Sequence, residues 1–482
     1  VDAAVAIDEV KKFISQRDLD AATRYVPPVV TPTRAGGFDQ KIAIVGAGPA
    51  GLSCAFYLAE KGYKPVVFEK NERPGGMLTY GIPSFKLQKD VIEAEVEVIR
   101  LMGAEFRYGV EVGRDVTLDE LRAQGFKAFY VAIGCQGGRL AGIPGEDAED
   151  VTVAVDFLRE VNSGKIDALP GRTIVVGGGN VAIDVARNAC RLGSEHVEMF
   201  CLESEAQMPA SEEERREAIE DGAHISCGWG PKKVHLDEAG RVCGITFKRC
   251  TRVYDDEGRF APEYDENDLR RVDADRVVMS IGQSIVWGDL LAGSKVELGR
   301  GQGALADPQT YQTAEPDIFV GGDVYTGPSF AIDAIAAGHE AAVSIHRFVQ
   351  PGSTLTIGRN QRRYAALDRD DVVIESYDNA SREVAHVDRE REKAAPFSEY
   401  VETFTEEQVR AETARCLGCG ASIVDPNKCI GCGLCTTKCA FDAIHLDRDR
   451  PECSTMVKYE QKLPSLGKYA LKRAIKIKFG RK

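Results

Sequence analysis

The chain lacks a surplus of positive charge. Its 482 residues carry 61 Lys and Arg against 75 Asp and Glu, which gives a formal net charge of −14. A protein that binds nucleic acid in general needs a basic face, so this balance excludes that function class. The chain also lacks internal repeats with a period of about 20–50 residues, which excludes solenoid and propeller folds. A chain of this length instead predicts an ordinary globular protein of two to four domains.

The hydropathy pattern of the sequence also predicts neither a membrane span nor a signal peptide. Residues 42–59 form an uncharged stretch of 18, long enough for a hydropathy scan to flag. The glycine-rich turn inside this stretch instead predicts a buried strand, a tight turn and the apolar face of a helix. We therefore expect no membrane-spanning segment and a cytoplasmic location.

Redox-type spacing is absent from the cysteines upstream of residue 251. We interpret each of these seven as an ordinary core or surface residue, so a disulfide exit for electrons is not expected. They are Cys54, Cys135, Cys190, Cys201, Cys227, Cys243 and Cys250. The total of 14 cysteines is large for a cytosolic protein and favours metal ligation over disulfides.

The chain does have two glycine-rich turns, each between an apolar strand pattern and a helix. The first, Gly46 to Gly51 (GAGPAG), follows residues 41–45, and the next strand pattern ends at Glu69. Gly46 makes the turn, Gly48 admits a pyrophosphate, and the third glycine permits close packing of helix and strand. The positive helix end faces the phosphates and Glu69 accepts ribose hydroxyls. The alternative is a glycine-rich turn that binds no ligand.

The second turn has the sequence Gly177-Gly178-Gly179-Asn180-Val181-Ala182 and follows a strand pattern at 173–176. Residues 196–202 are its second strand. Apolar residues 317–320 then return to strand character before Gly321-Gly322-Asp323. This order predicts an α/β fold with two doubly wound, Rossmann-like domains, one inserted in the other.

The second strand of the second unit ends in Glu203 and Ser204. An acidic side chain there suits the free ribose diol of NAD. It would repel a 2′-phosphate at ~4 Å by about 1–4 kcal/mol, depending on the effective dielectric. We therefore prefer NADH over NADPH. In the alternative, Glu203 points to solvent and Arg215 or Arg216 takes the phosphate.

A ferredoxin-type cysteine run lies near the C-terminus. Its CxxCxxCxxxC spacing is typical of a 4Fe-4S cluster, and a CxxC pair lies upstream. The predicted metal ligands are Cys416, Cys419, Cys429, Cys432, Cys435 and Cys439. Six cysteines are too few for two all-cysteine cubanes, and Cys453 adds only a seventh. Three alternatives stay open: one cubane plus zinc, two cubanes with a non-cysteine or partner ligand, and zinc for all of them.

One stretch allows a family resemblance to be named. Gly75 to Pro83 (GGMLTYGIP) resembles the GGLLxYGIP segment of the glutamate synthase small-subunit family. That family includes the flavin half of dihydropyrimidine dehydrogenase and the large subunit of NADH-dependent ferredoxin–NADP oxidoreductases. Residues 208–210 (MPA), 280–283 (SIGQ) and 321–328 (GGD, then GP) match its other segments, so the similarity covers about residues 40–350. It implies FAD in the first site and a nicotinamide cofactor in the second.

The resemblance adds detail at three places. NADPH-using relatives carry two arginines in a YRR segment where this chain has Leu202 and Glu203. In the related flavoproteins, an Asp at the position of Asp323 holds the ribityl chain. The resemblance implies that the helix over 331–342 points its N-terminus at the isoalloxazine ring. No catalytic acid or base is predicted, because hydride transfer between cofactors needs none.

The turns and the resemblance together predict the cofactor-binding residues. These are Gly46, Gly48, Pro49, Ala50, Gly51, Glu69, Lys70, Gly76, Met77, Leu78, Ile82, Gly134, Gly322, Asp323, Ser329, Ala331, Gly177, Gly179, Asn180, Val181, Ala182, Glu203, Ser204 and Gly282.

These patterns divide the chain into five parts. They are an N-terminal helical segment and connector (1–38, helix at 7–14), an FAD domain (39–168 and 311–350), an NAD(H) domain (169–310), a surface linker (351–410, helix near 406–414) and a ferredoxin-like α+β iron–sulfur module with a basic tail (411–482). The first residues resemble the exit of the family's N-terminal cysteine-rich domain. Either the chain is a fragment, or the C-terminal module replaces that domain.

The sequence therefore predicts an enzyme, an NADH-oxidising flavin iron–sulfur subunit of a multisubunit oxidoreductase. Hydride would pass from NADH to FAD, and single electrons to one or two 4Fe-4S clusters and then to another subunit or ferredoxin, in either direction. The alternatives are an NADPH-dependent glutamate synthase-type small subunit and a free-standing NAD(P)H reductase of a small molecule. The basic tail is either a solvated terminus, a docking element for an acidic partner or a clasp on the flavin domain.

Overall fold

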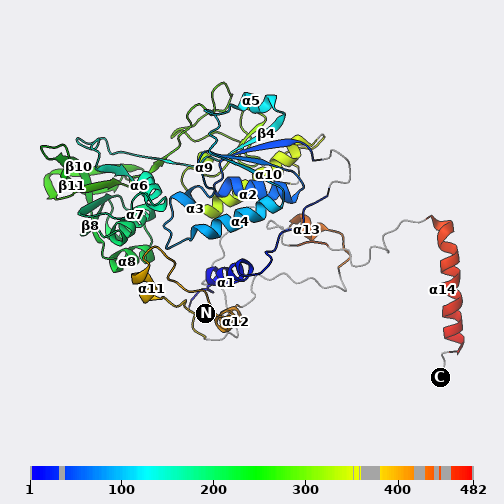
Figure 1. Cartoon of the computed structure of the whole chain (residues 1–482). Helices are drawn as coiled ribbons and strands as arrows, with labels where there is room; N and C mark the ends of the chain where they lie inside the picture. Colours follow the sequence, from blue (N-terminus) through cyan, green and yellow to red (C-terminus); the bar gives the residue numbers. More distant parts are fainter. Residues whose placement is uncertain are drawn as a thin grey trace. The chain divides into compact units, whose positions relative to one another are not determined.

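The computed structural model describes residues 3–31, 38–350, 352–357, 359, 380–416, 429–438, 444–446 and 458–479 (Figure 1). They fall into two compact units. One comprises Val1–Ile357 with Ile374–Leu417, and the other comprises Gly358–Val373 with Gly418–Lys482.

The first unit contains a five-stranded parallel sheet in the order β15-β4-β1-β2-β3. Its strands are β1 (Lys41–Val45), β2 (Val66–Glu69), β3 (Glu105–Tyr108), β4 (Phe126–Val131) and β15 (Ile318–Val320). Residues 42–59, the uncharged run, form the buried part of β1, the turn and α2 (Pro49–Glu60). Parallel strands are covered on both faces, which explains why β1 is apolar after Lys41.

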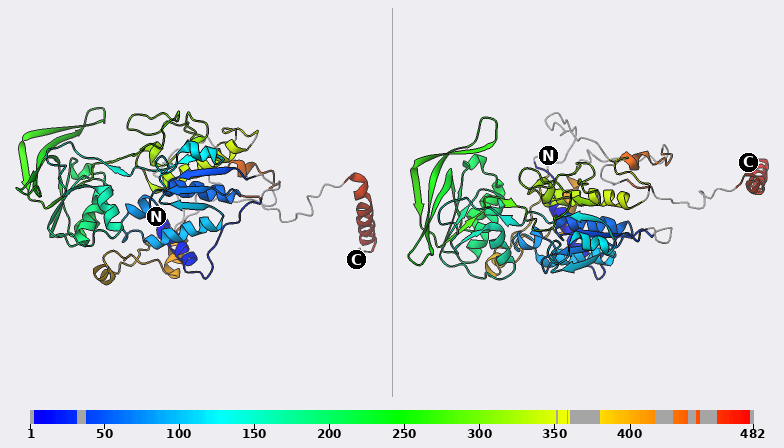
Figure 2. Two further views of the ribbon diagram at one scale, coloured as in Figure 1. Left: turned by 45° about the horizontal axis from the view of Figure 1, so that its top comes forward. Right: turned by 90° about the horizontal axis from the view of Figure 1, so that it is seen from above.

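Helices α2 and α10 (Ala331–Val349) pack on each other beside this sheet (Figures 1 and 2). Leu58 and Ile345 are fully buried in one cluster with Ile42 and Ile44 of β1. The other helices around this sheet are α3 (Met77–Tyr80), α4 (Lys89–Leu101), α5 (Leu118–Ala123) and α9 (Asp323–Thr326).

A second parallel sheet has the order β6-β13-β7-β8-β9. Its strands are β6 (Val151–Val153), β7 (Arg172–Val176), β8 (His196–Cys201), β9 (His224–Cys227) and β13 (Arg276–Met279), with α6 (Ala154–Asn162), α7 (Asn180–Arg191), η1 (Glu205–Gln207) and α8 (Glu212–Glu220). An antiparallel meander adjoins it, made of β10 (Trp229–Leu236), β11 (Val242–Tyr254) and β12 (Phe260–Val272).

The chain leaves the first sheet after β4 and returns to it with β15, so the second sheet lies inside the first in sequence. The predicted changeovers at 168 and 310 need correction. β6 already pairs with β13, and Leu290 and Ala304 are buried with the first sheet. The physical reason is that β5 (Gly137–Gly138) and β14 (Gln283–Ser284) pair antiparallel where the chain crosses between the sheets.

Residues 380–416 differ from the predicted linker. They include α11 (Arg389–Ala394) and α12 (Glu406–Ala414), and the second helix has the predicted bounds. However, Phe404 is only 3% exposed, and Glu412 is fully buried, where its Oε1 accepts from the Ala6 N–H at 2.8 Å. The segment is therefore packed onto the first unit at these positions, next to the start of α1 (Ile7–Leu19), and the predicted boundary at 411 cuts through α12.

In the second unit the structure describes α13 (Leu434–Lys438) and α14 (Tyr459–Phe479). Cys419, Cys439 and Cys453 lie outside the described residues. Within the described ranges, no helix is long and apolar enough to cross a membrane. The cytoplasmic location stays a prediction.

Candidate functional site

The first glycine turn connects β1 to α2. Gly46 has φ +104°, and a Cβ there would lie 2.5 Å from the Ala132 carbonyl oxygen. A Cβ on Gly51 would lie 1.9 Å from the Gly46 carbonyl oxygen, so the third glycine serves helix–strand packing. Gly48 is the N-cap of α2, and Pro49 fills the first helical position. The free N–H groups of this helix start are suited to a phosphate.

Glu69, at the end of β2, is buried beside this turn. Its Oε2 accepts from the Ala47 N–H at 2.8 Å, and its Oε1 accepts from the Asn71 N–H at 2.9 Å. These bonds hold the carboxylate in place at the pocket wall. Gly76 has φ +54°, and a Cβ there would lie 2.9 Å from the Gly48 Cα. The two glycine segments therefore touch, which explains why both are needed.

Asp323 opens α9, after Gly322 with φ +66°. Burial raises the pKa of Asp323, and a hydrogen bond from the Ser329 backbone partly opposes this. Ala331 and Ala334, in the first turn of α10, line the same cavity as Asp323. This places the positive end of a long helix at the cavity wall.

The second turn repeats the first. Gly177 has φ +144°, and a Cβ there would lie 2.2 Å from the Ser280 carbonyl oxygen. Gly179 is the N-cap of α7, and a Cβ at that position would meet no heavy atom within 4 Å. The space beside Gly179 is therefore open to a ligand. Asn180 accepts from the Ser211 N–H at 3.1 Å, which ties the helix start to the loop after β8.

Glu203 lies just after β8 and faces the second turn. A Cβ on Gly178 would lie 3.0 Å from its Oε2. Arg215, by contrast, donates to the Glu205 carbonyl at 2.7 Å, and Arg216 lies 3.9 Å from Glu213. Neither arginine is among the described residues that line the cavity.

A single cavity of about 1340 Å³ brings the two turns together. Twenty of the predicted cofactor residues line it. They are Gly46, Gly48, Pro49, Ala50, Glu69, Lys70, Gly76, Met77, Ile82, Gly134, Gly177, Gly179, Asn180, Val181, Glu203, Gly282, Gly322, Asp323, Ser329 and Ala331. Gly51, Leu78, Ala182 and Ser204 are not in its lining, and Ala182 is fully buried in the core.

The cavity has further polar and aromatic walls that the sequence analysis did not find. Arg139, Asp184, Lys248, Trp229 and Tyr264 also line it. Lys248 donates to Glu266 at 2.7 Å and lies over the Tyr264 ring at 4.1 Å. Nothing in the local sequence marks Trp229, Lys248 and Tyr264 of the meander, because they belong to no glycine-rich turn. Asp184 lies in α7 four residues after Asn180, on the same face of the helix, and this spacing could have marked it.

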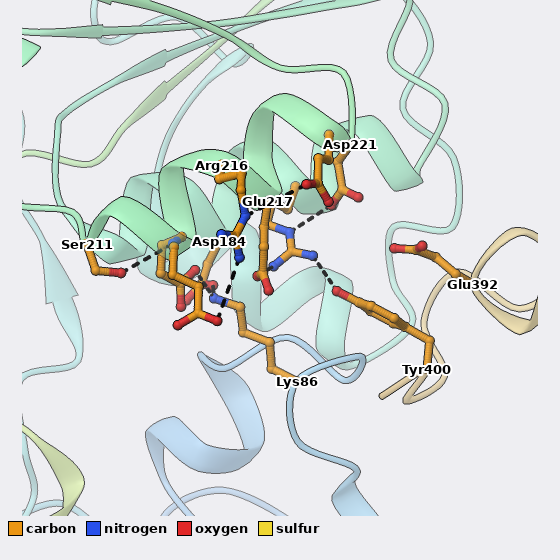
Figure 3. Close-up of polar contacts among 12 residues, drawn as sticks. Lys86, Asp184, Ser211, Arg216, Glu217, Asp221, Glu392 and Tyr400 are labelled. Atoms are coloured by element: carbon orange, nitrogen blue, oxygen red, sulfur yellow. Dashed lines mark hydrogen bonds and ion pairs between the residues drawn. The ribbon is translucent and has the colours of Figure 1, made fainter. Parts of the chain in front are cut away.

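Lys86 connects the two sheets' helices (Figure 3). It follows α3 in the first domain, and its Nζ donates to Asp184 of α7 at 2.6 Å and to Glu214 of α8. The side chains of Lys86 and Asp184 are 22% and 15% exposed. Burial raises the pKa of Asp184 to about 6, and Lys86 opposes this rise.

Residues 380–416 contact α7 as well. Arg187 of α7 donates to the Tyr400 hydroxyl at 2.7 Å (Figure 3). Arg191 donates to Glu392 at 2.7 Å. Arg191 also lies over the Phe85 ring at 4.2 Å. Helix α7 is thus bonded to Lys86 of the first domain through Asp184, and to the 380–416 segment through Arg187 and Arg191.

We expect Lys86→Met to lower the free energy of unfolding at pH 8 by about 3 kcal/mol, since it leaves the Asp184 carboxylate buried without its cation. The folded-state pKa of Asp184 would rise above about 6, so the folded state would take up a proton that the unfolded state does not. The loss should therefore shrink as the pH falls from the raised pKa of the variant to about 6, the pKa of Asp184 in the unaltered chain, and stay constant below that. Urea unfolding of the holoprotein at pH 8 and pH 5.5 measures it.

The matched control is the double variant Lys86→Met/Asp184→Asn, which should recover part of the stability at pH 8. An equal loss at both pH values would contradict the charge argument and indicate lost packing alone.

Of the predicted metal ligands, Cys416, Cys429, Cys432 and Cys435 lie in the described part, and all are exposed. Gly431 and Gly433 have φ +67° and +76°. Positive φ is easy for glycine and lets the backbone curve around a bulky group. Among the described residues, no group of three or more ligand side chains is gathered for a metal, and the two other predicted ligands lie outside them.

Comparison with protein families gives two matches. Residues 40–338 match the model for pyridine nucleotide-disulphide oxidoreductases, which is more than half of the chain. The chain belongs to this family. Residues 422–445 match the model for 4Fe-4S binding domains. The protein is thus an oxidoreductase of the NAD(P)H-dependent FAD type with a ferredoxin-like module.

Curated relatives refine this. The chain is 34% identical over 366 residues to the glutamate synthase [NADPH] small chain of Escherichia coli K12, covering 72% of this chain and 75% of the relative. It is 32% identical to the NAD-dependent dihydropyrimidine dehydrogenase subunit PreT of E. coli O157:H7, covering 73% of this chain and 77% of PreT. The resemblance to the glutamate synthase small-subunit family is confirmed.

A third relative matches a larger share of this chain. The chain is 33% identical over 451 residues to the NADP(+)-dependent formate dehydrogenase subunit beta of Moorella thermoacetica, which is 87% of this chain. It spans only 62% of that subunit's length. Among solved structures, Mycobacterium tuberculosis FprA in complex with NADPH has a TM-score of 0.55 at 19% identity, covering 64% of this chain and 84% of FprA. That likeness concerns the fold alone.

Proposed function

We propose that this chain oxidises NADH at the second turn, passes the electrons to FAD at the first, and delivers them singly through the C-terminal cysteine module to a partner subunit or ferredoxin. The observation that carries the proposal is the single cavity lined by both turns. One continuous space lets the reactive rings of two dinucleotides meet, and hydride transfer requires such contact.

The residues present fit FAD at the first turn. Gly48 lines the cavity, and a Cβ there would meet only the Gly76 Cα, at 4.0 Å, so a Cβ would occupy space that is open to a phosphate. The start of α2 offers free N–H groups beside this space. Glu69 is held by backbone N–H groups at the end of β2, where a ribose diol would bind. Bound FAD supplies the conversion of a two-electron hydride into single electrons.

The choice of NADH rests on Glu203. Its carboxylate lies beside Gly178 at the cavity wall, while Arg215 and Arg216 bond elsewhere. Lys248, the cation of the meander that lines the cavity, is already paired with Glu266. Relatives include enzymes named for NAD and for NADP(H), so family membership does not decide the coenzyme.

The test is anaerobic reduction of the purified chain. We expect heat to release FAD, identified by chromatography, and NADH to bleach the flavin absorbance at least about tenfold more efficiently than NADPH, as the charge repulsion implies. Release of FMN, or of no flavin, would overturn the assignment of FAD to the first turn. An efficiency tenfold higher with NADPH would overturn the coenzyme choice and favour an NADPH-dependent glutamate synthase-type subunit.

We also propose that α14 docks the chain on an acidic partner. Lys468, Lys472 and Arg473 lie on this exposed helix together with Leu466 and Leu471. A helix with cations and apolar side chains suits a partner's groove bordered by carboxylates. Removing residues 468–482 should weaken complex formation and its dependence on salt. Unchanged binding that does not respond to salt would exclude docking.

A further inference from the structure

Two cysteines that lie 26 positions apart in sequence meet beside the second turn. Cys201 is the last residue of β8 and Cys227 the last of β9, and the parallel register pairs them directly. Their Sγ atoms are 3.7 Å apart. Cys201 is only 2% exposed, whereas Cys227 is partly exposed. Cys227 is therefore the more accessible residue of the pair, and Cys201 is the more deeply buried one.

One cysteine of the pair, Cys201, belongs to the wall of the nucleotide cavity. A Cβ on Gly178 would lie 2.8 Å from the Cys201 Cβ. The carbonyl of Glu203 accepts from the Gly228 N–H at 2.9 Å, and the Cys201 Sγ lies 3.7 Å from that same carbonyl. A movement of either sulfur is thereby transmitted to the glycine turn and to Glu203.

We propose that Cys201 and Cys227 form a reversible disulfide that weakens nucleotide binding at the second turn. The oxidant is a small-molecule disulfide of the glutathione class. The Cys227 thiolate attacks one sulfur of the oxidant, forming a mixed disulfide and releasing one thiol. The Cys201 sulfur, after losing its proton, attacks the Cys227 sulfur and releases the second thiol. In total, two electrons and two protons pass from the cysteines to the small disulfide.

The order of attack follows from the surroundings of each sulfur. Burial raises the pKa of Cys201, and the neighbouring Cys227 adds to this rise, so Cys201 is the poorer nucleophile. Cys227 is the accessible partner and reacts first. The S–S bond of ~2.05 Å is much shorter than the present separation, so the ends of β8 and β9 must close on each other. The bond also removes the S–H group that faces the Glu203 carbonyl.

The experiment uses the full, cofactor-loaded chain in anaerobic glutathione buffers of stepped redox potential. Differential alkylation and peptide mass spectrometry follow the Cys201–Cys227 link. Flavin bleaching at stepped nucleotide concentrations follows binding. We expect the link to form and reverse with potential. The half-saturating NADH concentration should rise about two- to tenfold in the linked form, the effect of losing one hydrogen bond.

Cys227→Ser removes the accessible sulfur and should keep the binding of the reduced protein at every potential. Cys243→Ser is the matched control, because Cys243 is a partly exposed cysteine of the same domain whose Sγ contacts the His235 carbonyl. It should respond as the unaltered chain does. No link at any potential, or a link with unchanged NADH saturation, would overturn the proposal. Failure of the proposed function is separate, since it appears as absent bleaching in the reduced protein.

Discussion

Replacing Cys432 with Ser is expected to reduce electron delivery to ferredoxin to less than about a hundredth, because the variant loses one of the proposed thiolate ligands of the cluster. Bleaching of the flavin by NADH should stay within about twofold of the unaltered chain, since that step uses the cavity of the other unit. Stopped-flow absorbance separates the two steps, and iron analysis reports cluster loss. Reduction of a small dye directly at the flavin should persist.

Thr437→Ala is the matched control for this variant. Thr437 lies on α13 near the same cysteines, and its hydroxyl donates to the Leu434 carbonyl at 2.9 Å. Its loss removes a local hydrogen bond but no ligand, so ferredoxin reduction should continue. If Cys432→Ser retained full ferredoxin reduction, electrons would have to leave the flavin by another route, and the proposed role of the module would be wrong.

The double variant Leu202→Arg/Glu203→Arg should reverse the coenzyme preference. It removes a carboxylate from the cavity wall and supplies two cations where a 2′-phosphate would lie. The repulsion of about 1–4 kcal/mol then disappears, so the ratio of NADPH to NADH efficiency should rise about tenfold to a thousandfold. Flavin reduction rates at stepped concentrations of each coenzyme measure this ratio.

Two single variants serve as a control and as a test of the alternative phosphate site. Arg216→Ala changes an exposed arginine that lies 3.9 Å from Glu213 and 3.8 Å from Glu220 and does not line the cavity, so the ratio should not move. Arg215→Ala tests the alternative phosphate site. If the unaltered chain preferred NADPH and Arg215→Ala removed that preference, Arg215 would hold the phosphate and the role proposed for Glu203 would be wrong.

Much of the fold could be predicted because its signals are local. Each glycine turn needs residues without a Cβ at fixed positions, and Gly46 and Gly177 show why: their conformation and close contacts admit no side chain. The ends of the strands that the patterns marked lie within about two residues of the observed ends, because these buried parallel strands are mostly apolar. The predicted exchange between sheets was misplaced because the β5–β14 pairing joins distant segments and has almost no local signature.

The sequence by itself determined two glycine-rich turns of the dinucleotide type, an acidic residue after the second strand of the second unit, and a ferredoxin-type cysteine run, since each depends on residues close together along the chain. Only the tertiary structure decided that both turns open into one cavity, that Lys86 meets Asp184, and that Cys201 faces Cys227. These contacts depend on the order and register of strands in the sheets. Strand order is set by the packing of the whole chain, so spacing along the sequence carries no record of it.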